Sequence, residues 1–158
     1  MLKVEIIAIG KLSQPFIRDG VGEYSKRVRP YYDLVITELS EYKPAGNSAA
    51  DCLKVIEAEG ARIQKALDSR KNPVTALTPE GSAMSSEEFA YSLTSSSDTG
   101  GRIFIIGGSL GLSDGVKKRA GTLLSLSAMT LPHQLARLVL LEQVYRAAAI
   151  NFSLPYHK

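Results

Sequence analysis

Short runs of apolar and β-branched residues alternate along the chain with longer segments in which apolar residues recur at helical spacing. The short runs are typical of buried strands, and the longer segments are typical of amphipathic helices. The pattern predicts strands at residues 2–9, 34–39, 74–77, 103–106 and 126–131, and helices at 15–28, 49–69, 85–94 and 134–150. A further short helix fits between the last two strands. The alternation predicts an α/β fold with a mostly parallel sheet and helices on both faces.

Helical spacing also predicts which residues face the core. The expected stripes are Phe16, Ile17, Val21 and Tyr24 in the first helix, and Leu53, Ile56, Ile63 and Leu67 in the second. Residues 41–50 are predicted to form a loop, with Asn47 or Ser48 as the cap of the next helix. Residues 78–82 are predicted to form a turn, and the serine-rich residues 95–101 a flexible connection.

The last helix is apolar nearly all round, which predicts burial on most sides. In a chain of 158 residues we expect a partner subunit to bury part of it. Glu142 and Arg146 stand four residues apart in the order that favours an ion pair.

Small and glycine residues follow two of the predicted strands. The turn Gly107-Gly108-Ser109-Leu110-Gly111 comes directly after residues 103–106, and Pro132 ends residues 126–131. Ligands of parallel sheets bind beyond the carboxyl ends of the strands, so we expect a pocket for a flat, polar ligand here. The turn has neither dinucleotide-binding glycine spacing nor the Lys-Ser/Thr of a phosphate loop. A tight turn without a ligand is therefore the alternative.

The composition limits the class of protein. A single cysteine, Cys52, excludes a disulfide within the chain. Residues 2–9 carry charges and are too short for a signal peptide, and no apolar run reaches the length that spans a bilayer. The net charge of +3 permits an anionic partner without requiring one. Some basic residues cluster, and each cluster is either a solvated face or a binding surface. The clusters are Lys26, Arg27 and Arg29, and Lys117, Lys118 and Arg119, while Arg137, Arg146 and Lys158 add charge near the last helix and the tail.

Five motifs occur in order along the chain. They are Val-Thr-Ala-Leu at 74–77 with Glu80-Gly81 after it, Phe-Ile-Ile-Gly-Gly-Ser-Leu-Gly-Leu at 104–112, Ser-Leu-Ser-Ala-Met-Thr-Leu-Pro-His-Gln at 125–134, Leu-Leu-Glu-Gln-Val-Tyr-Arg-Ala at 140–147 and Pro-Tyr-His-Lys at 155–158. With the opening Ile-Ala-Ile-Gly-Lys-Leu, they resemble the RlmH family of SPOUT methyltransferases over essentially the whole chain.

The resemblance implies a single SPOUT domain over residues 1–158, with a deep trefoil knot in roughly 74–158, an exception to the rule that chains do not thread loops. It implies a cytoplasmic homodimer that uses S-adenosylmethionine, without a metal, to methylate N3 of a pseudouridine in 23S rRNA. The expected substrate is the assembled ribosome, and neither DNA nor a membrane is an expected partner.

The resemblance also implies site residues. The methyl donor would contact Leu77, Gly107, Gly108, Leu126, Ser127, Ala128, Met129, Thr130 and Leu131. The imide nitrogen must lose its proton before it attacks, so the site needs a base or a cation that stabilises the anion. The candidates are His133, Glu142, Arg146, Tyr156, His157 and Lys158. Each also has a structural interpretation: a backbone-bonded histidine, a simple Glu142–Arg146 ion pair, and a frayed tail.

Two other functions stay open on the sequence. One is a different SPOUT enzyme that acts on tRNA, although such enzymes often carry an extra RNA-binding domain. The other is a non-catalytic ribosome-associated protein that keeps the knot.

Overall fold

The structure is a computed structural model that describes residues 1–95 and 100–158, so the centre of the serine-rich connection predicted at 95–101 lies outside the described residues. Within the described chain, five strands form one parallel sheet in the order β2-β1-β4-β3-β5. The strands are β1 (Lys3–Ile9), β2 (Asp33–Leu39), β3 (Val74–Ala83), β4 (Gly101–Ile106) and β5 (Thr122–Ser125). The predicted α/β fold is confirmed.

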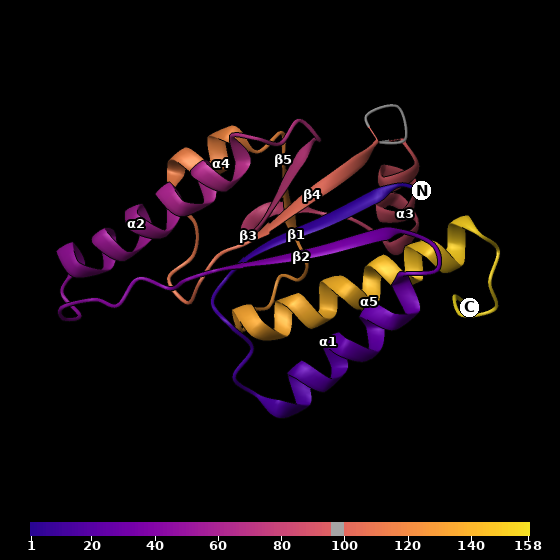
Figure 1. The fold of residues 1–158 in the computed structure, drawn as a ribbon, viewed down its shortest axis with the longest axis horizontal. Helices are drawn as coiled ribbons and strands as arrows, with labels where there is room; N and C mark the ends of the chain where they lie inside the picture. Colours follow the sequence, from indigo (N-terminus) through magenta and orange to yellow (C-terminus); the bar gives the residue numbers. More distant parts are fainter. Residues whose placement is uncertain (96–99) are drawn as a thin grey trace.

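Helices cover both faces of the sheet (Figure 1). One face carries α1 (Pro15–Val28), α3 (Ser86–Thr94) and α5 (His133–Asn151), and the other carries α2 (Ala49–Leu67) and α4 (Asp114–Arg119). Each face has its own apolar core. Because successive strand residues point to opposite faces, Phe104 belongs to the larger core under α5 and Ile105 to the smaller core under α2.

Serine caps fix where three helices begin. Ser48 accepts a hydrogen bond from the Asp51 amide, and the Asp51 carboxylate accepts one from the Ser48 amide in return. Ser85 and Glu88 form the same capping box at α3, and Ser113 caps α4. Each pair satisfies amides that have no partner within the helix. The prediction of Ser48 as a helix cap is confirmed.

β3 does not end at the predicted turn. It continues through residues 78–82 to Ala83, because it pairs with β5 a second time after a register shift between Leu77 and Ser82. Gly81 permits this close approach. A Cβ at Gly81 would lie 2.6 Å from the Leu124 carbonyl carbon, so a larger residue would push the two strands apart.

The fifth strand is also placed differently from the prediction. β5 comprises Thr122–Ser125, and residues 126–131 form an irregular segment between β5 and α5. The small and apolar residues of this segment line a pocket instead of pairing with a neighbouring strand.

Some helix residues predicted to face the core are exposed. Ile17, Val21, Ile63 and Leu67 are buried as predicted. By contrast, Phe16 is 68% exposed and Leu53 is 57% exposed.

α5 is buried mostly by its own chain, since it packs against both α1 and α3 (Figure 1). Leu140, Leu141 and Val144 are fully buried. Leu138 packs on Gly20 of α1, where a Cβ would lie 2.9 Å from Leu138 Cδ1. The chain itself therefore buries much of α5, but Leu135, Leu138 and Tyr145 are only partly buried, so the partner subunit on α5 stays a prediction. In the part of the chain that the structure describes, no helix is both long and apolar enough to span a membrane.

Candidate functional site

A pocket of about 590 Å³ opens where β3, β4 and β5 end. We call it the strand-end pocket. Three segments line it: residues 77–80, residues 106–112 and most of residues 124–133. Eight of the nine predicted donor contacts are among its lining residues, and Ala128 is not. The carboxyl ends of parallel strands meet at one edge of a sheet, so segments distant in sequence converge here.

The glycine turn brings bare backbone to the pocket. The Gly111 amide donates a hydrogen bond to the Gly108 carbonyl at 3.1 Å, and Gly111 has a φ of +86°, which favours glycine. A Cβ at Gly107 would lie 2.9 Å from Leu112 Cδ2 and 3.0 Å from the Gly111 carbonyl carbon. The tight turn therefore depends on its glycines, and it also lines a cavity.

Residues 126–131, apart from Ala128, form another part of the pocket wall. Ser125 Oγ donates to the Ser127 carbonyl at 2.9 Å, and the Met129 amide donates to Ser127 Oγ at 3.0 Å. These local bonds hold an irregular backbone that offers its remaining polar groups to a ligand. Met129 is 79% exposed and lies at the rim.

An ion pair crosses the pocket rim between β3 and α4. Glu80 is paired with Lys117 and also accepts a hydrogen bond from the Thr78 hydroxyl. The bond from Lys117, and then the bond from Thr78, lower the pKa of Glu80 to about 2. Lys117 is thus partly neutralised and is not a free member of its basic cluster.

His133, the first residue of α5, lies in the wall of the strand-end pocket. Its Nε2 atom is buried and has no hydrogen-bond partner among the described residues, while Glu41 Oε1 lies 3.9 Å away. A buried ring nitrogen without a partner is available to a ligand or a proton, which favours a functional role for His133.

The other catalytic candidates gather at the far end of α5. Glu142 accepts hydrogen bonds from Arg146 Nη2 at 2.6 Å and from the Tyr156 hydroxyl at 3.0 Å. The Arg146 guanidinium stacks 4.8 Å from the centre of the Tyr156 ring. His157 lies 3.3 Å from Arg146 Nη1 and 2.9 Å from Glu87 Oε1. We call this group the tail cluster.

The tail cluster argues against the alternative in which residues 156–158 are only a frayed tail. Tyr156 and His157 dock on α5 of their own chain, and Lys158 is exposed at the end. A hydrogen bond with the Tyr24 hydroxyl, burial, and the Glu142 carboxylate raise the pKa of Tyr156. Tyr156 therefore remains a neutral hydrogen-bonding phenol at physiological pH.

Sequence reasoning missed a group of charged residues beside the pocket. Arg137, counted among the basic residues near the last helix, is only 2% exposed and bonds to Glu38 Oε2 at 2.5 Å and to the Gly10 carbonyl at 2.9 Å. Glu59 is 4% exposed within the apolar stripe of α2. The signal was present in the sequence, because Glu59 lies four residues before Ile63 on the buried face.

The sequence matches the family model described as "Predicted SPOUT methyltransferase" over residues 2–157. It is 49% identical over 160 residues to proteins named "Ribosomal RNA large subunit methyltransferase H" from Bacillus thuringiensis (strain Al Hakam) and Bacillus anthracis. Each match covers 99% of this chain and 100% of the relative. The chain belongs to the SPOUT methyltransferase family.

Solved structures agree with this SPOUT methyltransferase in fold. A putative methyltransferase from Legionella pneumophila in complex with S-adenosylmethionine has a TM-score of 0.50 and 16% identity, covering 90% of this chain and 65% of that one. A putative methylase family protein from Neisseria gonorrhoeae has a TM-score of 0.52 and 13% identity, covering 99% of this chain and 94% of that one. At these identities the likeness shows the fold alone, and the knot in residues 74–158 stays a prediction.

In this SPOUT methyltransferase the two sets of predicted site residues are separated along α5. Glu142 follows His133 by nine residues, which is about 14 Å at the rise of an α-helix. The strand-end pocket and the tail cluster of one chain therefore lie at different places on the same helix.

Proposed function

We propose that this SPOUT methyltransferase transfers a methyl group from S-adenosylmethionine to N3 of a pseudouridine in 23S rRNA of the large ribosomal subunit. The observation that carries the proposal is 49% identity, over the full length, to relatives named as methyltransferases of large-subunit ribosomal RNA. The strand-end pocket also supports it, because a cavity lies at the carboxyl ends of the strands, where ligands of parallel sheets bind.

The strand-end pocket fits S-adenosylmethionine in size and chemistry. Its volume of about 590 Å³ lies in the ordinary range for small-molecule sites, roughly 300 to 1,000 Å³. Leu77, Leu126 and Leu131 offer apolar surface for an adenine ring, and the turn at Gly107 brings the backbone close. Bound there, the donor supplies an electrophilic methyl group on a positively charged sulfur.

The protein residues must position the uracil ring and remove the N3 proton. His133 is the residue that lies at the pocket with a free buried ring nitrogen, so we assign it as the proton acceptor. Arg146 in the tail cluster offers a cation for the imide anion, and Tyr156 offers an aromatic face for the base. Glu142 holds both of these side chains in place.

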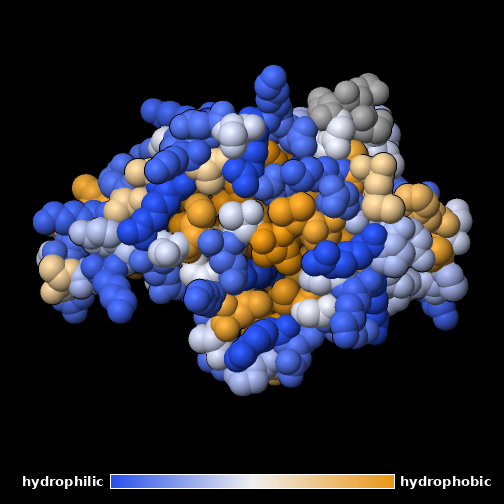
Figure 2. Space-filling model, in the orientation of Figure 1, coloured by the Kyte–Doolittle hydropathy of each residue, from blue (hydrophilic) through white to orange (hydrophobic). Residues whose placement is uncertain are grey.

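We propose that the complete site needs two subunits. The pocket and the tail cluster of one chain are separated by about 14 Å along α5, which is too far for both to act on one methyl group. A two-fold dimer can bring the tail cluster of one subunit to the pocket of the other. Figure 2 shows apolar side chains gathered over β2 and α5 on the face of the molecule that this view presents. Subunit interfaces bury surfaces of this kind.

The decisive experiment uses 50S and 70S particles that lack the modification. Incubation with labelled S-adenosylmethionine, followed by digestion and mass mapping, should place one methyl group on a pseudouridine of 23S rRNA. Transfer of the labelled methyl group to tRNA instead would show that the enzyme acts on another class of RNA substrate. Donor binding with no transfer to any particle would contradict the proposed function.

A further inference from the structure

Glu59 is buried in α2, and its two carboxylate oxygens face two different segments. Oε2 accepts a hydrogen bond from the Tyr42 amide at 3.1 Å. Oε1 is buried, and no residue that the structure describes gives it a hydrogen bond. It lies 2.8 Å from the position that a Cβ would occupy on Gly108, in the glycine turn of the strand-end pocket. One side chain thus contacts both the loop after β2 and the pocket turn.

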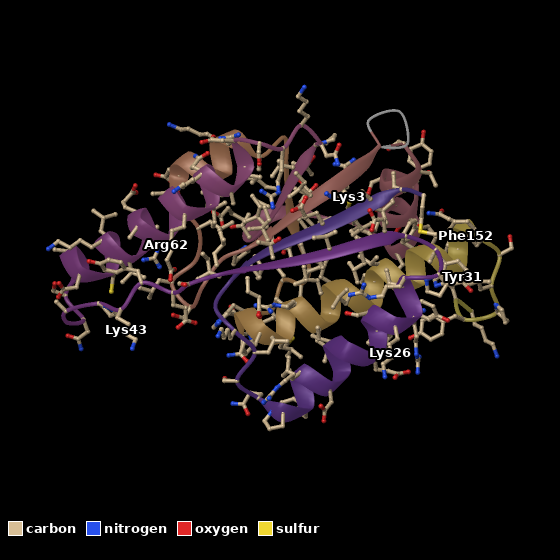
Figure 3. The ribbon with its side chains drawn as sticks, viewed as in Figure 1. Lys3, Lys26, Tyr31, Lys43, Arg62 and Phe152 are labelled. Carbon is tan, nitrogen blue, oxygen red and sulfur yellow. The ribbon has the colours of Figure 1, made fainter. Side chains whose placement is uncertain are left out.

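The loop at residues 40–47 has a second contact with α2. Arg62 Nη1 donates to the Ser40 carbonyl at 2.5 Å, and the Arg62 guanidinium lies 5.9 Å from the centre of the Tyr42 ring. In Figure 3, Lys43 and Arg62 lie on the same side of the molecule, near the loop that leads into α2. The loop offers an aromatic ring and the cation Lys43, and α2 places the cation Arg62 beside them, a combination that is suited to contact nucleic acid.

The same loop also reaches the pocket from the other side. Glu41 Oε1 lies 3.9 Å from Nε2 of His133, in the pocket wall. The loop therefore touches the pocket through Glu41 and His133, and again through Tyr42, Glu59 and Gly108. A change in the loop conformation must alter at least one of these contacts.

The groups around Glu59 make the stability of its buried carboxylate depend on the loop at residues 40–47. Burial raises the pKa of Glu59, the Glu41 carboxylate raises it further, and the Tyr42 amide and Arg62 lower it. Among the described residues, only the Tyr42 amide of the loop donates a hydrogen bond to the Glu59 carboxylate, and it donates to Oε2. The free energy of the buried Glu59 carboxylate is therefore lowest when the loop lies over it and donates this bond.

We propose that Glu59 is a positioning residue that couples the loop at residues 40–47 to the strand-end pocket, so that RNA at the loop and the methyl donor in the pocket each favour binding of the other. The inference rests on the proposed function, which supplies the RNA and the donor. Coupling between two sites is reciprocal, so donor binding alone must also order the loop. This consequence is measurable without RNA.

The test uses S-adenosylhomocysteine, the demethylated product, as an unreactive probe. Hydrogen–deuterium exchange of residues 40–47 is followed with and without saturating probe, and calorimetry gives the affinity. The variants are Glu59→Ala, which removes both contacts, and Glu59→Gln, which keeps the shape and an acceptor for the Tyr42 amide. Glu57→Gln is the matched control, because Glu57 is exposed two residues earlier on the same helix.

The probe should slow exchange in the loop in the wild type, Glu57→Gln and Glu59→Gln. In Glu59→Ala the slowing should be lost and the probe affinity should fall about fivefold, the lower end of typical coupling. If Glu59→Ala does not fold, Glu59→Asp takes its place, because the shorter side chain cannot hold both segments.

Two outcomes contradict the inference in different ways. If the probe binds the wild type but leaves exchange in residues 40–47 unchanged, or slows it equally in Glu59→Ala, the coupling is wrong and the proposed function stands. If the probe does not bind the wild type, the proposed function fails, and the coupling fails with it.

Discussion

At the scale of single residues, the Glu80–Lys117 pair at the pocket rim predicts a pH dependence. The pKa of Glu80 in the folded chain is about 2, below its ordinary value of 4.5, so folding favours the ionised form. The stabilisation is complete above pH 4.5 and is lost as the pH falls toward 2. Because the Glu80 side chain is 52% exposed, we expect less than about 1 kcal/mol. Urea unfolding of wild type and Glu80→Gln should show a difference at pH 6 that shrinks by pH 3.

A larger effect is expected at the buried Arg137. Glu38→Ala would leave this guanidinium buried without its carboxylate, and because the Glu38 side chain is 37% exposed we expect a loss of about 2 kcal/mol, less than in fully buried pairs. Urea unfolding at pH 7 measures this loss, and Glu57→Ala, at an exposed position, should change stability by less than about 0.5 kcal/mol. Equal losses in the two variants would show that Arg137 finds another partner.

Single residues also show where prediction from sequence reached its limit. The glycine turn was predicted to line a pocket because it follows a strand of a parallel sheet, and residues 126–131 were predicted to contact the methyl donor because the motifs resemble the RlmH family. Arg137 was predicted on the surface, because the sequence does not show that the fold brings Glu38 and the Gly10 carbonyl within hydrogen-bond distance of it. Pairings between residues distant in sequence leave no local pattern.

At the scale of elements, we expect the tail cluster to be needed for methyl transfer and not for folding. Removing residues 156–158 deletes Tyr156 and His157 but no part of the buried core. Donor binding and the thermal midpoint should change little, while methyl transfer should fall at least a hundredfold. Calorimetry, thermal unfolding and the particle assay measure the three quantities. Full activity in the shortened protein would remove the tail from the site.

Most element boundaries were predictable, because periodicity and capping residues are local. β3 and β5 were not, since the second pairing of β3 depends on Gly81 lying against β5. The stripe in α1 failed at Phe16 for a related reason. Periodicity assigns an apolar residue to one face of a helix, but it does not show whether that face packs on the sheet or stays exposed and able to bind another molecule.

At the scale of the whole molecule, exposed Phe16 predicts a dimer contact on α1, beside α5. Phe16→Glu would place a charge in a buried interface, so it should raise the dimer dissociation constant at least tenfold. Leu53→Glu is the matched control, an exposed apolar residue on α2, across the sheet from α1. Sedimentation at micromolar concentration distinguishes them. A wild-type protein that sediments as a monomer would exclude the shared site.

A mixed dimer tests whether the site is shared. One subunit lacks residues 156–158 and the other carries Gly107→Leu, which both fills the pocket and crowds the turn at Leu112. If pocket and tail act across the interface, one of the two sites is intact and activity returns to about half. A folded mixed dimer that stays inactive would place both elements in the same subunit's site.

The order of the strands has a consequence for synthesis of the protein. β1 is made first, yet one of its two neighbours is β4, with Lys3 opposite Gly101. At about 5 to 20 residues per second, the edge of β1 that will pair with β4 stays open for roughly 5 to 20 s after β1 emerges. During that time the chain presents a strand that is apolar from Ile6 to Ile9, with free amides and carbonyls along one edge. The nascent protein is therefore exposed to mispairing and aggregation at a strand that later lies between β2 and β4 inside the sheet.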